Sequence, residues 1–158
     1  MAGGVFAGDQ VSKQWVAAHL PMDREVPVLP PVLYWLYTTN DGVAWSMFRR
    51  HTDFFAAVAA VFCVGMLVVV RRSIETSTFS AVVVGLLVGG AVGNLVDRAR
   101  LHFVVDFINV HIGTLYNWPT FNVADSAISI GIVMLAYRYL ILDHEHKDCL
   151  HHNPSSKV

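Results

Sequence analysis

Charged residues are scarce in this sequence. Asp, Glu, Lys and Arg make up only 15% of the 158 residues, whereas hydrophobic residues make up 54%. Soluble domains carry nearer to a quarter charged residues, so the deficit favours a protein that lies in lipid. The formal net charge is -1, which gives no sign of the basic surface that nucleic-acid binding requires. We therefore predict a membrane protein without a nucleic-acid partner.

Cysteine is almost absent, and the sequence gives no evident sign of a secretory signal peptide. Cys63 lies in an apolar run and Cys149 in a polar tail, so the sequence does not indicate a disulfide framework. The N-terminus has neither the charged n-region nor the small-residue cleavage site of a secretory signal peptide. We expect the apolar segments to be kept as membrane spans.

Long uncharged runs are present. A spanning helix needs about 20 predominantly apolar residues. Residues 54–70 and 76–96 contain no charged side chain, and residues 124–142 contain only two, Asp125 at the start and Arg138 near the end. These runs predict spans at about 54–71, 76–97 and 124–142.

The N-terminal segment is a weaker candidate for a span. Asp9 and Lys13 interrupt it, and only eight residues precede Asp9. An even number of crossings would put both termini on one side, so we expect four, with a short first span at about 2–20. The four-residue spacing of Asp9 and Lys13 favours an ion pair on one helix face.

Two segments between the spans are unsuited to contact with lipid. Residues 21–52 hold four of the six prolines, and residues 101–123 hold asparagines, glycine and proline that would leave polar groups unpaired in hydrocarbon. Val32–Tyr37 and Val104–Val110 are typical of strands. With four crossings both segments fall on the same side, where they would form a small cap. Charge alone leaves the orientation open, because arginines lie on both sides.

The predicted organisation is one membrane domain over residues 1–142 followed by a polar tail at 143–158. Tails of this composition are usually flexible. The tail contains several potential metal ligands, but a solvated His-rich tail is the simpler interpretation. These ligands are His144, His146, Cys149, His151 and His152.

The span at 76–97 carries two rows of residues at four-residue spacing. The first row is Gly85, Gly89 and Gly93, and the second is Gly90, Asn94 and Arg98. The glycine row is typical of close contact between helices. The second row has two interpretations. Either the amide bonds a neighbouring helix while the guanidinium reaches the headgroups, or the row lines a cleft that holds a peptide backbone.

Asp106 and Asp125 form the candidate catalytic pair. Asp125 alone could be an ordinary acid in a helix first turn, whereas Asp106 lies in an apolar strand that offers it no obvious partner. The predicted topology brings both to one membrane surface. Two adjacent carboxyls share a proton, so one can activate water while the other protonates a scissile carbonyl. Asn122 stands three residues before Asp125 and could orient a carboxylate. This chemistry needs no metal or cofactor.

Two other classes of protein remain open on these residues. Intramembrane acids also occur in ion-coupled transporters, although there they lie near the bilayer midplane beside broken helices. A scaffold subunit would use the glycine row for assembly alone. The separation of the two carboxyls distinguishes these classes from a peptidase.

Five stretches of the sequence together resemble the successive motifs of lipoprotein signal peptidase, or signal peptidase II. The stretches are DQVSK (9–13), NDGVAW (40–45), GGAVGNLVDR (89–98), VVDFI (104–108) and FNVADSAISIG (121–131). Their order and spacing match, and they cover most of the chain from Asp9 to the last span. The set is much more specific than any single motif. One departure is the short apolar segment before the first motif.

The resemblance implies a mainly α, four-helix transmembrane bundle with a small periplasmic β-sheet, the β-cradle, and a short extramembrane helix. It implies a monomeric aspartic endopeptidase of the bacterial inner membrane that cuts prolipoproteins before their diacylglyceryl-modified cysteine. Membrane lipids and globomycin-like inhibitors would be its other ligands, and both termini would be cytoplasmic. By motif match Asp106 and Asp125 are catalytic, whereas the other family positions contact substrate. These positions are Asp9, Asn40, Gly90, Asn94, Arg98 and Asn122.

Overall fold

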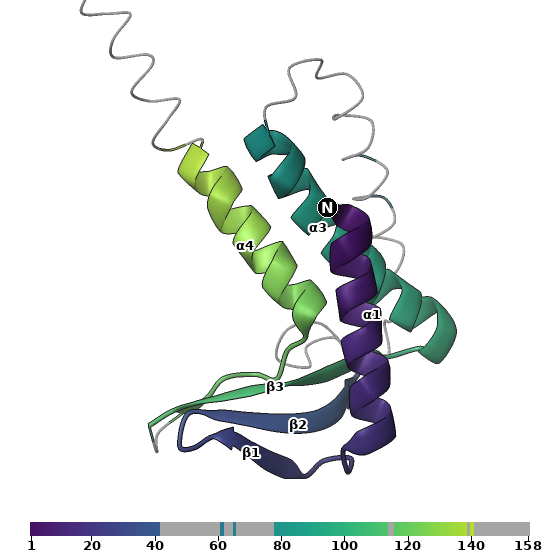
Figure 1. Cartoon of the computed structure of the whole chain (residues 1–158), viewed down its shortest axis with the longest axis vertical. Coiled ribbons are helices and arrows are strands. Elements are labelled where there is room, and N and C mark those ends of the chain that lie inside the picture. The colour runs from purple at the N-terminus through teal and green to yellow at the C-terminus, as the bar shows by residue number, and fades with distance from the viewer. Residues whose placement is uncertain (42–60, 62–64, 66–77, 114–115, 139, 141–158) are drawn as a thin grey trace, which may run out of the picture.

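The computed structural model describes residues 1–41, 61, 65, 78–113, 116–138 and 140. In chain order the elements are α1 (Ala2–His19), β1 (Glu25–Leu29), β2 (Leu33–Asn40), α3 (Thr78–Leu101), β3 (Val104–Ile112), β4 (Tyr116–Asn117) and α4 (Val123–Tyr137). The described helices stand beside one another, and the sheet lies across one end of them (Figure 1). The molecule therefore has a helical layer and a small cap.

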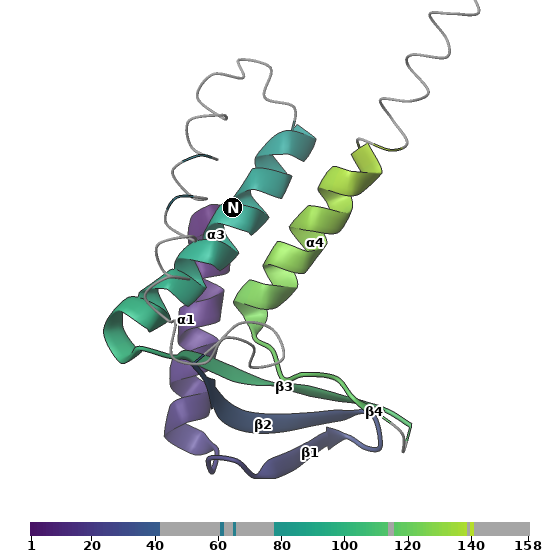
Figure 2. The same cartoon turned by 180° about the vertical axis from the view of Figure 1, so that it is seen from behind.

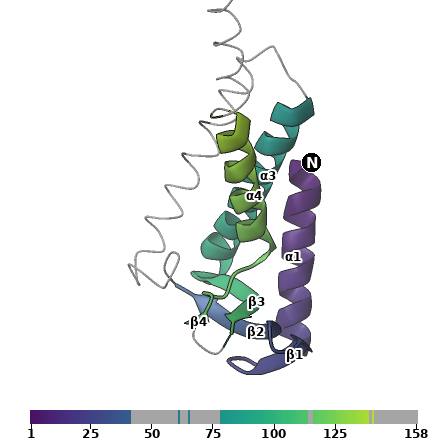
Figure 3. The ribbon, with the colours of Figure 1, turned by 90° about the vertical axis from the view of Figure 1, so that its left-hand side faces the viewer.

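Helix α3 packs against both α1 and α4 (Figure 3). Its glycines permit this close packing. A methyl group at Gly89 would lie 2.7 Å from the Ala2 carbonyl oxygen of α1, and one at Gly90 would lie 2.5 Å from the Ala124 carbonyl oxygen of α4. The glycine row thus makes the helix contact that the sequence predicts, and Gly90 makes an equally close contact on a second face.

The cap is an antiparallel sheet with strand order β1-β2-β3-β4 (Figure 2). Its central pair joins the two predicted strand segments, with Asn40 opposite Val104 and Thr38 opposite Asp106. The prediction of a small cap built from both segments is therefore correct. The observed strands extend further than predicted, to Asn40 and Ile112. Strands β1 and β4 were not predicted.

The four-helix transmembrane bundle is not confirmed by the described residues. Within the described ranges α3 is the one helix that is long and apolar enough to cross a membrane, and α4 is a shorter apolar helix of 15 residues. Helix α1 is 18 residues long and lies within the predicted segment 2–20. The predicted span at 54–71 falls almost wholly outside the described residues, as does the tail at 143–158. The predicted extramembrane helix is not among the described elements.

Polar side chains are buried where the helices meet the sheet. The buried hydrophobic residues include Val16 of α1, Leu87 of α3 and Phe107 of β3. A polar group removed from water requires hydrogen-bond partners, so these buried side chains must bond to one another or to the backbone. The buried polar residues are Asp9, Lys13, Asn94, Asp97, Asp106, Asn109 and Asn122.

Candidate active site

Asp106 lies in the part of β3 that runs beside the helices, with its side chain almost entirely buried. Its Oδ2 accepts a hydrogen bond from Asn40 Nδ2 at 3.0 Å, and its Oδ1 accepts one from Asn122 Nδ2 at 2.7 Å. The sequence offered no partner for this carboxyl. The structure supplies two, one from the end of β2 and one from the start of α4.

Asp125 occupies the first turn of α4 and belongs to its N-terminal cap. Its backbone N–H donates to Asn122 Oδ1 at 2.9 Å, and the Asn122 N–H donates to Asp125 Oδ2 at 3.2 Å, which is a capping box. Its other carboxyl oxygen, Oδ1, accepts from Asn94 Nδ2 at 2.8 Å. The capping interpretation of Asp125 is therefore correct, and it leaves the carboxyl facing a polar group of α3.

Asn122 connects the two aspartates. Its side-chain amide donates to Asp106, its backbone N–H donates to Asp125, and no part of the residue is exposed. The same amide also approaches Asn94 Oδ1 at 3.1 Å and the Val105 carbonyl at 3.3 Å. A single buried residue thus fixes the positions of both carboxyls relative to each other.

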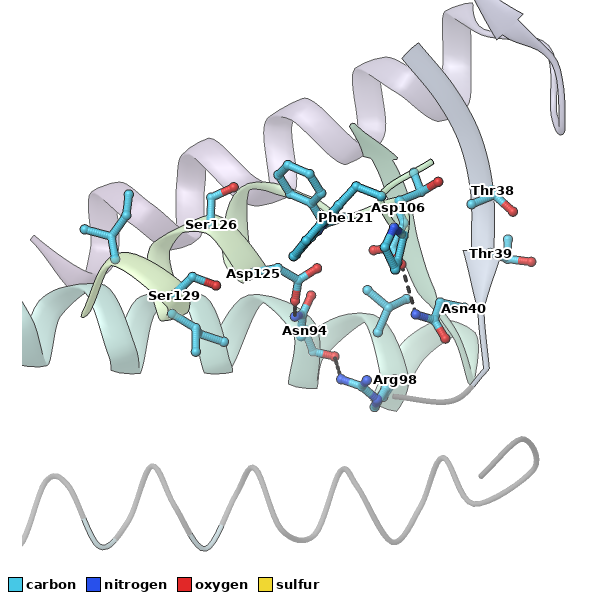
Figure 4. Close-up of a pocket in the computed structure, with 16 residues that line it drawn as sticks. Thr38, Thr39, Asn40, Asn94, Arg98, Asp106, Phe121, Asp125, Ser126 and Ser129 are labelled. Atoms are coloured by element: carbon cyan, nitrogen blue, oxygen red, sulfur yellow. Dashed lines mark hydrogen bonds between the residues drawn. The ribbon is translucent and has the colours of Figure 1, made fainter. Parts of the chain in front are cut away.

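Both aspartates line one pocket of about 720 Å³ between the sheet and helices α3 and α4 (Figure 4). Asn40, Asn94 and Arg98 add polar groups to its wall. Pockets of a few hundred to 1,000 Å³ are the usual size for binding sites, with a few polar groups that fix orientation. The other lining residues are Thr38, Thr39, Val104, Trp118, Pro119, Thr120, Phe121, Ser126, Ile128, Ser129 and Ile130.

Burial, and next the neighbouring charge of Asp125, raise the pKa of Asp106 from 3.8 to about 7. Hydrogen bonds from Asn40 and Asn122 and the positive charge of Lys13 act in the opposite direction. A carboxyl with this pKa retains its proton in a large share of molecules near neutral pH. It can therefore act as a proton donor beside a second carboxyl.

A buried ion cluster lies next to the pocket. Lys13 Nζ is 2.9 Å from Asp9 Oδ2 and 2.9 Å from Asp97 Oδ2, so the predicted pair of Asp9 and Lys13 is confirmed and gains a third member. Gln10 Nε2 donates to Asp97 Oδ1 at 2.9 Å. Asp9 Oδ1 accepts from the Ala124 N–H at 2.9 Å, which ties α1 to the first turn of α4.

The predicted site residues divide into three groups. Those that line the pocket are Asn40, Asn94, Arg98, Asp106 and Asp125. Asn122 and Asp9 are completely buried and bond to groups that surround the pocket instead. Gly90 packs against α4. The space beside Gly90, which the sequence analysis assigned to a substrate, is therefore filled by α4.

Sequence reasoning missed two members of this network, Gln10 and Asp97. Each had a signal. Asp97 follows Asn94 by three residues, so both lie on one side of α3, and Gln10 is adjacent to Asp9 within the DQVSK stretch. Among the described residues no group of His, Cys, Asp and Glu side chains could hold a metal ion.

Comparisons with known proteins agree on one family. The profile of the family described as signal peptidase (SPase) II matches residues 1–141. A lipoprotein signal peptidase of Geobacillus thermodenitrificans (strain NG80-2) is 36% identical over 135 residues, which is 85% of this chain and 84% of that protein.

Two solved structures are also similar, and both are described as bacterial membrane enzymes determined by the in meso method. The one at 2.3 Å resolution superposes with a TM-score of 0.83 at 28% identity, covering 98% of this chain and 90% of the other. The one at 1.9 Å gives 0.79 at 30% identity, covering 89% and 90%.

Proposed function

The chain belongs to the signal peptidase II family, and we propose that it cuts prolipoproteins with Asp106 and Asp125 as its catalytic pair. Membership of this family makes the chain a protease that removes signal peptides from prolipoproteins. The finer proposal is an aspartic endopeptidase of the bacterial inner membrane, with the pocket on the periplasmic side and both termini in the cytoplasm. It acts as a monomer and cuts immediately before the diacylglyceryl-modified cysteine.

The observation that carries this proposal is the shared setting of the two carboxyls. Asp106 and Asp125 line the same pocket, and Asn122 donates a hydrogen bond to each of them. An acid that only capped α4 would not need a second buried acid beside it. A second carboxyl with a raised pKa is what acid–base catalysis by such a pair requires.

In the proposed mechanism Asp106 carries the proton and Asp125 is ionised. Asp125 lies in the first turn of α4, where the helix dipole favours negative charge, and it accepts a bond from Asn94. Asp125 removes a proton from water while the resulting hydroxide attacks the scissile carbonyl carbon. Asp106 donates its proton to the carbonyl oxygen. The C–N bond of the tetrahedral intermediate then breaks as the proton now on Asp125 passes to the leaving amine. One hydroxyl of the intermediate returns its proton to Asp106 as the new carboxyl group forms, which restores both aspartates.

The pocket wall suggests how the substrate lies. Toward the sheet it offers the Asn40 amide and the Arg98 guanidinium, and along α4 it offers Ile128 and Ile130. An unwound peptide backbone at the cut site would meet the polar groups. The apolar helix of the signal peptide would continue along α4 within lipid, and its lipid-modified cysteine would keep its acyl chains in the bilayer. Globomycin-like peptides would compete for the same space.

The test is cleavage of a lipidated precursor by Asp106→Asn and Asp125→Asn, each reconstituted in lipid. Asp23→Asn is the matched control, since Asp23 is exposed and its φ of 54° is one that Asn also tolerates. We expect both site variants to lose turnover and the control to keep it. Near-normal turnover in both site variants would refute the two-aspartate mechanism.

A further inference from the structure

We propose that Lys13 is a positioning residue for the reaction, because it fixes the Asn94 side-chain amide so that its N–H faces Asp125. The inference rests on the proposed function. It assigns to a lysine of α1, outside the pocket wall, a part in arranging the catalytic pair.

The Lys13 ammonium has a fixed place for each of its three protons. It is only 3% exposed, and its Nζ lies 2.9 Å from Asp9 Oδ2, 2.9 Å from Asp97 Oδ2 and 2.9 Å from Asn94 Oδ1. An ammonium group has three donors and no acceptor. With three acceptors at hydrogen-bond distance, its orientation is fully determined.

The contact with Asn94 determines which way that amide points. Because an ammonium can only donate, the end of the amide that faces Lys13 must be its oxygen. Asn122 Nδ2 donates to this same oxygen at 3.1 Å, which reinforces the choice. The Asn94 nitrogen must then point away, and it donates to Asp125 Oδ1 at 2.8 Å. Reversing the amide would bring its oxygen against the carboxylate.

The arrangement reaches the second aspartate as well. The Asn122 amide that bonds Asn94 also donates to Asp106 Oδ1 at 2.7 Å. Lys13 is therefore linked to Asp125 through the Asn94 amide. It is linked to Asp106 through Asn94 and then Asn122. The ion pair with Asp97 already joins α1 to α3, and the pair with Asp9 lies within α1. The third bond, to Asn94, is the one directed at the site.

A test must separate this bond from the ion pairs. Lys13→Met alone would leave two buried acids facing each other without a cation, which is strongly destabilising. We therefore choose Asp97→Asn as the background. One positive and one negative charge are then absent from Lys13→Met/Asp97→Asn, so the net charge of the cluster equals that of the native protein. The Asn side chain can still accept a bond from Lys13 in the background protein.

The experiment is a double-mutant cycle in this background. Lys13→Met and Asn94→Ala are introduced singly and together, and kcat and KM are measured on a lipidated precursor. We expect Lys13→Met to lower kcat about 10- to 100-fold, the value of one hydrogen bond to a charged group, with KM changed less than about twofold. Once Asn94 is Ala, the same change should lower kcat less than about threefold. Equal losses with and without Asn94 would overturn the proposal.

Asp106→Asn in the same background separates this inference from the function on which it rests. If that variant keeps its turnover, the two-aspartate mechanism fails. If it loses turnover and the cycle is additive, only the role of Lys13 fails.

A second variant covers the case in which Lys13→Met/Asp97→Asn does not fold. Asn94→Asp, made in the native chain, retains Lys13 and its bond to one oxygen. Lys13 then holds the new carboxylate so that its second oxygen, with no proton to donate, faces Asp125. We expect this variant to be at least about fivefold slower than Asn94→Ala, since it replaces a donor with a like charge. Equal or faster turnover than Asn94→Ala would overturn the proposal.

Discussion

Strand β3 carries a titratable side chain near each end, and the two lie in contrasting surroundings. Asp106, beside the helices, is almost completely buried and bonds to residues of β2 and of the α4 cap. His111, at the outer end, pairs with Glu25 at 3.2 Å and stacks on Tyr34 with ring centroids 4.4 Å apart. The Glu25 side chain is 41% exposed. We call these the inner end and the outer end of the sheet.

The difference shows that hydrogen bonds between elements are concentrated at the inner end. At the inner end Asp106, Asp125 and Asn122 bond to groups of other elements, because a buried amide or carboxyl without a partner would cost about 1–3 kcal/mol. At the outer end water can replace any contact that is lost. Substitutions of similar size should therefore have unequal effects at the two ends, and the predictions below test this from the largest effect to the smallest.

The largest difference should separate Asp106 from His111. We expect Asp106→Asn to reduce kcat by about 10²- to 10⁴-fold, the usual contribution of a general acid, and His111→Gln to change kcat less than about twofold. Both substitutions remove the acid–base function and retain a polar side chain. The measurement is single-turnover cleavage of a lipidated precursor. A comparable loss in His111→Gln would show that the outer end also takes part in the reaction.

The second difference concerns buried amides. Asn122→Ala removes bonds to both aspartates and the cap of α4, so we expect kcat to fall at least about tenfold and the free energy of unfolding to fall by about 1–3 kcal/mol. Asn109→Ala is the matched control, because Asn109 is also a buried asparagine and donates one bond, to Thr120 Oγ1 at 3.2 Å.

Asn109→Ala should lower the free energy of unfolding by less, and it should leave kcat nearly unchanged. Urea denaturation in a fixed detergent, together with the cleavage assay, measures both quantities. If the two variants were equally active, Asn122 would be a helix cap and nothing more.

The third prediction uses pH. The pKa of Asp106 is raised from 3.8 to about 7, so the folded chain retains a proton that the unfolded chain loses near pH 4. The free energy of unfolding should therefore decrease as the pH rises from about 4 to about 7, by no more than about 4 kcal/mol, and then level off. Asp106→Asn should flatten this decrease. Thermal midpoints between pH 4.5 and pH 8 measure the effect. Loss of the Asp106 proton should also reduce kcat above about pH 7.

The sequence correctly predicts the helix and the strand that meet at the inner end of the sheet. Hydrophobic run length located α3, and the strand pattern located Val104–Val110, because both signals are local. The pairing of Asp106 with Asn40 could not be found in this way. It depends on a β2–β3 register in which Thr38 faces Asp106, with an irregularity between Trp35 and Thr38.

Burial was the other quantity that the sequence did not contain. Asp9 and Lys13 have the same spacing whether they form a surface pair or a buried one. Only the packing of α3 against α1 brings Asp97 to Lys13 and buries the pair of Asp9 and Lys13. Similarly, Gly90 fits a substrate cleft or a helix contact equally well until α4 is seen to occupy that side.

The smallest effect should come from Glu25→Gln at the outer end. This change removes the partner of His111 on an exposed part of the sheet, and exposed ion pairs typically contribute less than about 1 kcal/mol. Tyr34 still covers the His111 ring after the substitution, so the sheet retains its contact there. We expect the free energy of unfolding to fall by less than about 0.5 kcal/mol and kcat to stay within twofold of the native value. Raising the salt concentration should shrink even this difference, because screening acts on exposed charges first. A larger loss would mean that the outer end constrains the register of β3, and with it the position of Asp106.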